Sequence, residues 1–178
     1  MPGKTVAPGF FGKVPRSGDF VLRRLSKEFV TVWDAFVTQN VVPLMGDVIA
    51  WPENGLRFLL GDVVIGLEPH VGIVVPSHDQ VGRQFPLTVA SPLKIVASPT
   101  KIATWFAEIT GPTLDAAEGL IDVGELDLAL EGIASPQLSV QPSVPFQLIV
   151  PGLAPVVADF HNSSQVLREL LSAKAGVA

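Results

Sequence analysis

The stretch from Gly9 to Val21 has the sequence Gly-Phe-Phe-Gly-Lys-Val-Pro-Arg-Ser-Gly-Asp-Phe-Val, and it restricts the fold of this chain more than any other part. Its glycines permit positive φ angles and close backbone approaches, and its proline fixes φ. Each of its three phenylalanines can bury roughly 150–250 Å² if it turns inward. Three charged residues, Lys13, Arg16 and Asp19, lie between the aromatic ones. The stretch is therefore expected to be a hydrophobic strand end and turn that holds the N-terminal region against a core.

A second stretch rich in turn-forming and charged residues lies between two apolar segments. It covers residues 76–87, Pro-Ser-His-Asp-Gln-Val-Gly-Arg-Gln-Phe-Pro-Leu. Ser77 and Asp79 can accept hydrogen bonds from loop N–H groups, and Gly82 permits a chain reversal. Arg83 can bind Asp79 or a neighbouring carbonyl. Two interpretations remain open: a structural clamp, or a binding loop at a sheet edge. In either case we expect this stretch to lie close to the first one, with Arg83 paired to Asp79 or Asp19.

Charge is distributed unevenly along the chain. Residues 1–27 hold six of the twelve basic residues and a single acid, Asp19, whereas residues 102–167 hold eight acids and no base. Such asymmetry indicates either an ordinary solvated surface or an electrostatically steered protein contact, with Arg23 and Arg24 pointing to solvent. The basic cluster is short and the sequence pI is about 5.1, so nucleic acid is not an expected partner.

The arrangement of apolar segments predicts a single α+β domain over residues 1–178, with a mostly antiparallel central sheet flanked by helices. A helix from Ser26 to Val41, ended by Pro43, carries an apolar stripe that includes Trp33. A short turn is expected from Asp19 through Leu25, and a hairpin turn at Gly61-Asp62. The predicted strands are 57–60, 63–67, 71–75, 85–90, 146–150 and 156–160. The other predicted helices are one that Thr100 caps and Gly111-Pro112 interrupts, one over 113–132, and one from Asn162 or Ser163 through Leu171.

The sequence contains few of the patterns that catalysis or metal binding requires. It has no cysteine, no Gly-x-Ser-x-Gly elbow and no dinucleotide-binding glycine motif, and its three histidines lack paired ligand spacing. Ser77, His78 and Asp79 are the residue types of a hydrolytic triad, but adjacent residues point apart. We therefore expect no catalytic residue, cofactor or metal. The alternative is a small hydrolase or phosphate-ligand enzyme centred on Ser77, Asp79 and Arg83.

Together the two stretches resemble the TagF/ImpM family of type VI secretion-associated proteins. The first matches as Gly-Phe-Phe-Gly-Lys-x-Pro followed by Gly-Asp-Phe. The second matches as Pro-Ser-x-Asp-x-x-Gly-Arg-x-Phe-Pro-Leu. The resemblance covers about residues 9–93 of a TagF-like domain and weakens over residues 94–178.

The resemblance implies a cytoplasmic, non-catalytic accessory or regulatory protein of a type VI secretion system. It further implies a post-translational repressor of assembly that acts through a forkhead-associated scaffold protein. No apolar run reaches the ~18 residues of a membrane span, so membrane insertion is not expected. The candidate partner-binding or motif residues are Lys13, Arg16, Asp19, Arg23, Arg24, Ser77, Asp79 and Arg83.

Overall fold

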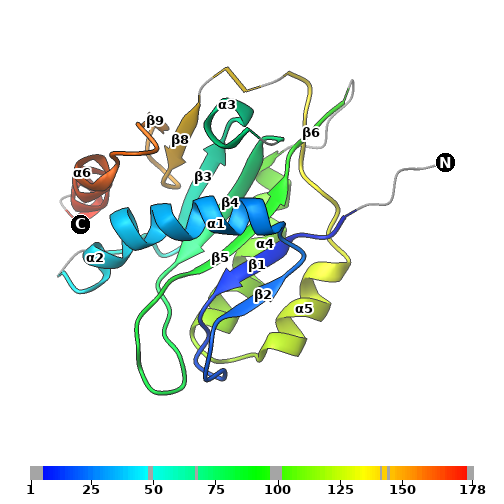
Figure 1. Ribbon diagram of the computed structural model, residues 1–178, viewed down its shortest axis with the longest axis vertical. Helices are drawn as coiled ribbons and strands as arrows, with labels where there is room; N and C mark the ends of the chain where they lie inside the picture. Colours follow the sequence, from blue (N-terminus) through cyan, green and yellow to red (C-terminus); the bar gives the residue numbers. More distant parts are fainter. Residues whose placement is uncertain are drawn as a thin grey trace.

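A seven-stranded antiparallel sheet forms the centre of the protein (Figure 1). The computed structural model describes residues 6–47, 50–66, 68–96, 102–140, 142–143 and 145–175. The strand order is β2-β1-β5-β4-β3-β8-β9. The strands are β1 (Gly9–Gly12), β2 (Val21–Arg23), β3 (Leu56–Leu60), β4 (His70–Val75), β5 (Leu87–Pro92), β8 (Phe146–Ile149) and β9 (Val156–Val157). A second, parallel pair joins β6 (Lys94–Ile95) to β7 (Gln137–Leu138).

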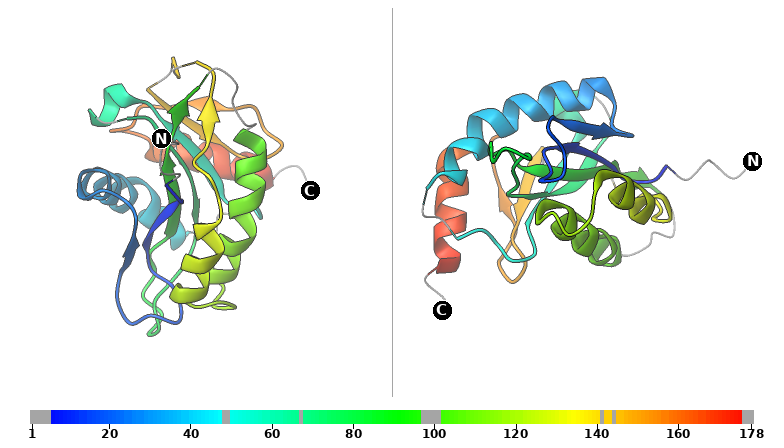
Figure 2. Two further views of the ribbon diagram at one scale, coloured as in Figure 1. Left: turned by 90° about the vertical axis from the view of Figure 1, so that its right-hand side faces the viewer. Right: turned by 90° about the horizontal axis from the view of Figure 1, so that it is seen from below.

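Helices cover both faces of this sheet, and Figure 2 shows them on opposite sides. One face carries α1 (Lys27–Phe36), the π-helix η1 (Val37–Val41), α2 (Val42–Met45) and α6 (Ser164–Ala175). The other face carries α4 (Ile102–Ala117) and α5 (Val123–Glu131). Each face therefore encloses its own hydrophobic cluster, and the predicted α+β class with a mostly antiparallel sheet is confirmed. Within the described residues, no helix is both long enough and apolar enough to cross a membrane.

The helix predicted from Ser26 begins there, because the Ser26 side chain accepts a hydrogen bond from the Phe29 N–H. Pro43, however, does not end it. The helix widens into η1, where the Val42 N–H bonds to the Val37 carbonyl, and Pro43 then lies at the start of α2. Proline is tolerated there because the N–H groups of a first helical turn need no partner within the helix.

The strand predicted at 63–67 is wrong, and so is the hairpin turn at Gly61-Asp62. Residues Asp62–Ile65 form a short helix, α3, within the connection from β3 to β4, which pair from Leu60 opposite His70. Gly66 ends α3 with φ at +64°, a left-handed conformation that glycine adopts without strain. β-branched residues suit strands, but a short apolar run does not by itself separate a strand from a helical turn.

Two further predictions need correction. The turn expected from Asp19 through Leu25 is instead the edge strand β2, which pairs with β1. The interruption expected at Gly111-Pro112 is absent, because α4 continues through Pro112. Tertiary packing overrides the local signal there, since Ile109 and Thr113 on either side of the proline are fully buried. Thr100 lies outside the described residues.

The helical pattern predicted over residues 113–132 divides between two elements. Its first part completes α4, and α5 begins at Asp122 with a capping box that Glu125 closes. The remaining strands and the last helix lie where predicted, with their ends displaced by a few residues.

Trp33 is the centre of the aromatic cluster under α1, as its position on the apolar stripe predicts. It is 1% exposed, and its indole Nε1 donates a 2.8 Å hydrogen bond to the Thr88 hydroxyl of β5. Its ring stacks on Phe58 of β3, with the centroids 4.0 Å apart. Trp33 thus attaches α1 to two strands at once.

We expect Trp33→Ala to lower the free energy of unfolding by about 3–5 kcal/mol, because the buried ring would be replaced by a cavity. Chemical denaturation followed by circular dichroism measures this difference. Leu128→Ala is the matched control, since Leu128 is 70% exposed and its loss should change stability by less than about 0.5 kcal/mol. A Trp33→Ala variant as stable as the control would contradict the core assignment.

Candidate functional site

The two motif stretches form neighbouring loops at one end of the sheet, where the strands that precede them end. β1 and β4 both pair antiparallel with β5, so they run in the same direction and their C-terminal ends lie at the same end of the sheet. The loops that follow them, residues 13–20 and 76–86, lie together at the lower end of the sheet in Figure 1. The Gln80 N–H bonds to the Ser17 carbonyl at 2.9 Å, and Arg83 Nη2 bonds to the Gly18 carbonyl at 3.2 Å. The expectation that the two stretches meet is confirmed.

Gly12 allows this close approach. Its φ is +140°, and a Cβ atom placed on it would lie 2.1 Å from the Pro86 carbonyl oxygen. Any side chain at this position would force β1 away from the start of β5. The second glycine of the Gly-Phe-Phe-Gly motif is therefore a requirement of packing between the two loops.

Asp79 lies at the centre of the junction, with a fully buried side chain. Its Oδ2 accepts hydrogen bonds from Lys13 Nζ at 3.0 Å and from Arg83 Nε at 2.7 Å. Its Oδ1 accepts from the backbone N–H groups of Val81 and Arg83, at 3.1 and 2.9 Å. A carboxylate offers about four lone-pair positions, so these four donors occupy its accepting capacity. The predicted pairing of Arg83 with Asp79 is confirmed.

These donors also determine the charge state of Asp79. Burial alone would raise the pKa of this carboxyl group. The Arg83 backbone N–H, the Lys13 ammonium, the Arg83 guanidinium and the Val81 N–H oppose burial and hold the pKa of Asp79 well below its usual range. Asp79 is therefore a carboxylate under all ordinary conditions, and it is stabilised by groups from both loops.

A small aromatic cluster covers Lys13. Its Nζ lies 5.1 Å from the centroid of the Phe20 ring, and Lys13 is only 8% exposed. Phe20 also contacts Phe11 and Phe85, with ring centroids 5.7 and 4.8 Å away, yet it remains 46% exposed. Leu22, opposite Phe11 on β2, is 43% exposed as well. The junction thus has the buried Lys13–Asp79 pair in its interior, while Phe20, Leu22 and the largely exposed Arg83 side chain form its outer surface.

Arg24 does not point to solvent, contrary to expectation. Its Nη1 pairs with Asp127 of α5, and its Nε donates to the Pro8 carbonyl at 3.0 Å. These bonds hold Arg24 with φ at +53°. Tertiary contacts of this kind are invisible to a local sequence pattern, because Asp127 is 103 residues away in the chain.

Arg16 and Arg23 remain half-exposed beside α5. Arg16 Nη1 lies 3.9 Å from Glu125 Oε2, and Arg23 Nε lies 4.0 Å from Asp127 Oδ2. Neither Glu125 nor Asp127 was predicted from the sequence to belong to the site. The signal was present in the charge asymmetry, since the base-rich N-terminal region and the base-free acidic region come together here.

Ser77 and Asp19 take no part in the ionic junction. Ser77 is buried, and its Oγ has no hydrogen-bond partner among the described residues. His78 Nδ1 bonds to the Asp79 backbone carbonyl at 2.8 Å and not to the Asp79 carboxylate. Asp19 is exposed and accepts a bond from the N–H of Phe20. Across the described ranges, no three His, Asp or Glu side chains converge as a metal site.

Comparison with known proteins gives a family match that includes both loops. A family model described as TagF N-terminal domain, type VI secretion system-associated, matches residues 9–133. The match therefore continues beyond Leu93 through α4 and α5. No curated protein matches this sequence. The crystal structure of PA0076 from Pseudomonas aeruginosa PAO1 is similar, with a TM-score of 0.60 and 25% sequence identity over 94% of this chain and 78% of that chain.

We expect Asp79→Asn to destabilise the protein most at neutral pH, because it leaves buried Lys13 without a counter-charge. The folded-state pKa of Asp79 is lowered, so its contribution is complete above the unfolded-state pKa of about 3.9. That contribution decreases as the pH falls below about 4. Urea denaturation of both proteins between pH 7 and pH 3 measures the difference.

The difference between wild type and Asp79→Asn should therefore shrink on acidification. Asp115→Asn is the control, because Asp115 is an exposed acid on α4. A difference that is constant with pH, or an Asp79→Asn variant as stable as Asp115→Asn at pH 7, would contradict the assigned role of the carboxylate.

Proposed function

This chain belongs to the TagF N-terminal domain family, which is type VI secretion system-associated, and we propose that it acts as a non-catalytic regulator that binds another protein of that system. The proposed partner is a forkhead-associated scaffold protein. The proposed effect is post-translational repression of assembly, in the cytoplasm. The family resemblance supports these finer points, and the geometry of the two loops supports the mode of action.

The observation that carries the proposal is the complete hydrogen bonding of Asp79. A general base needs a free lone pair to accept a proton, and four donors already occupy this carboxylate. Ser77 would need a neighbouring base to become a nucleophile, and its Oγ contacts none within the described chain. The motif residues are therefore arranged to hold two loops in fixed positions, which suits a recognition surface.

The groups that remain accessible around the junction suit a protein partner. We define the β2 edge surface as Arg16, Phe20, Leu22, Arg23 and Arg83, whose side chains are all substantially exposed. β2 ends the sheet, so both of its faces are accessible at this edge. Phe20 and Leu22 lie on the side of Phe11, and Arg23 points to the opposite side, towards α5, so the surface extends around the edge strand. Aromatic and arginine side chains are enriched in protein interfaces.

Fixed loops beneath this surface lower the entropy lost on binding. Lys13 and Asp79 neutralise one another, so the second cation on Asp79, Arg83, contributes net positive charge to the surface. A partner with a complementary acidic face would approach faster and in a defined orientation.

We expect the charge reversal Arg16→Glu with Arg23→Glu to slow association with the forkhead-associated scaffold protein by at least about tenfold, because it removes the attraction that steers the two proteins together. Binding of the purified proteins should also weaken as salt is added. In a secretion assay, the variant should behave like a deletion of the whole gene. Arg24 is left intact, because its contacts with Asp127 and Pro8 are structural.

Lys27→Glu with Arg168→Glu is the matched control. It changes the net charge equally at exposed positions outside the β2 edge surface. Both variants should keep the circular dichroism spectrum of the wild type. Normal binding and regulation by the folded Arg16/Arg23 variant would refute the proposal. So would a hydrolytic turnover of the wild type that Ser77→Ala abolishes.

A further inference from the structure

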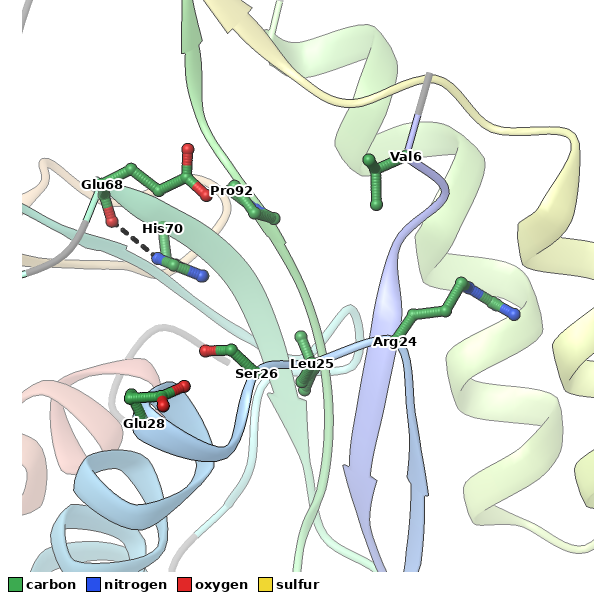
Figure 3. Close-up of a pocket in the computed structure, with 8 residues that line it drawn as sticks. All are labelled: Val6, Arg24, Leu25, Ser26, Glu28, Glu68, His70 and Pro92. Atoms are coloured by element: carbon green, nitrogen blue, oxygen red, sulfur yellow. Dashed lines mark hydrogen bonds between the residues drawn. The ribbon is translucent and has the colours of Figure 1, made fainter. Parts of the chain in front are cut away.

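A second candidate site lies at the opposite end of β1 from the ionic junction. A cavity of about 380 Å³ is present where β1 and β4 begin and where β5 ends (Figure 3). Its lining residues are Val6, Arg24, Leu25, Ser26, Glu28, Glu68, His70 and Pro92. The volume falls within the range of pockets that bind small ligands or single side chains.

His70 is the buried polar group of this cavity. It is 3% exposed, and its ring stacks on Phe29 with the centroids 4.4 Å apart. Its Nδ1 lies 2.8 Å from the Glu68 carbonyl oxygen. A carbonyl only accepts, so Nδ1 carries the proton and Nε2 is left with a free lone pair. Nε2 has no hydrogen-bond partner among the described residues, and it is not among the fully buried unpartnered atoms, so it remains accessible from the cavity.

Burial lowers the pKa of His70, although the carbonyl and carboxylate of Glu68 oppose this effect. The ring is therefore neutral near pH 7, and its free nitrogen is an acceptor. A cavity that contains such an acceptor is suited to a hydrogen-bond donor.

Two carboxylates give the cavity negative charge. Glu28 from the first turn of α1 and Glu68 from the α3–β4 connection are both exposed, and neither makes an ion pair with a described residue. In Figure 3 their side chains lie on either side of Ser26 and His70, whereas the Arg24 side chain extends away from them. The Arg24 guanidinium is held by Asp127 and the Pro8 carbonyl. The charge facing this space is thus predominantly negative.

The N-terminus of α1 does not alter this conclusion. Ser26 Oγ accepts the Phe29 N–H, so the helix start is already capped and does not present that group to an anion. The described His, Asp and Glu side chains form no cluster that could hold a metal ion. An organic cation fits this space, because the apolar walls of Leu25, Val6 and Pro92 suit an aliphatic stem.

We propose that this cavity binds an organic cation, an ammonium or guanidinium group on an aliphatic stem, through Glu28, Glu68 and the free Nε2 of His70. The cationic group donates to Nε2 and is neutralised by the two carboxylates, and its stem packs on the apolar wall. This site is separate from the β2 edge surface and does not depend on the function proposed for that surface.

Calorimetric titration with Nα-acetyl-arginine methylamide tests the proposal, with Nα-acetyl-citrulline methylamide as the neutral probe of nearly the same shape. The arginine probe should bind and should shift the NMR signals of the His70 ring, and the citrulline probe should not. A second arm uses agmatine, which carries the same guanidinium without a peptide backbone. If only the arginine probe binds, the natural ligand is a protein side chain. If agmatine binds as well, a small free guanidinium compound also fits the cavity.

Glu28→Gln with Glu68→Gln should weaken binding of the arginine probe on the order of tenfold, since two partly exposed charge interactions are lost. Glu53→Gln is the matched control, because Glu53 is exposed and outside the cavity. All variants should keep the melting temperature of the wild type. Absence of binding, equal binding of the citrulline probe, or unchanged affinity in the double variant would overturn the proposal.

Discussion

The burial of the Asp79 carboxylate is the constraint on which the loop end of this fold depends. An ionised group without solvent requires compensating donors, and here they come from two places: Val81 and Arg83 in its own loop, and the distant Lys13. Lys13 follows β1 directly, so the neutralisation of Asp79 requires β1 to pair with β5 on the side opposite β4. Gly12 makes that approach sterically possible. The charged residues and the glycine of the two motifs thus act together to hold the two loops against each other, and this arrangement leaves Phe20 and Arg83 at the surface.

Charge segregation in the sequence becomes charge pairing in the structure. The basic N-terminal region lies against α5, where Arg24 contacts Asp127 and Arg16 approaches Glu125. Of the contacts with α5, that of Arg24 is the least exposed to solvent, so it is expected to contribute more to stability than those of Arg16 and Arg23. The half-exposed Arg16 and Arg23 keep most of their hydration and can exchange α5 for an external acidic partner.

The sequence predicted those parts of the fold that follow from hydrophobic periodicity and from the positions of glycine, proline and helix-capping residues. The apolar stripe around Trp33 located α1, and short β-branched runs located most of the sheet. The Asp79–Arg83 pair was predicted because both residues lie in one loop. The meeting of the two motifs was predicted because each carries an acid and a base that would lack partners if it were isolated near the core. The errors at α3 and Pro112 arose where tertiary packing, and not local preference, decides between alternatives. Arg24 was misplaced for the same reason, since its partner is remote in sequence.

The two ends of β1 differ in how their polar groups are satisfied. At one end, every lone pair of Asp79 is occupied, and this saturation stabilises the fold but leaves the carboxylate no capacity for chemistry. At the other end, His70 is almost as deeply buried, yet Nε2 keeps a free lone pair. No local motif marked this cavity, because its walls come from α1, the α3–β4 connection and the end of β5. Nε2 is not among the fully buried side-chain atoms that lack a partner, so water or a ligand in the cavity can reach it. Asp79 is therefore a structural residue because its acceptors are saturated, whereas the free acceptor of His70 is the group that a donor in this cavity would bind.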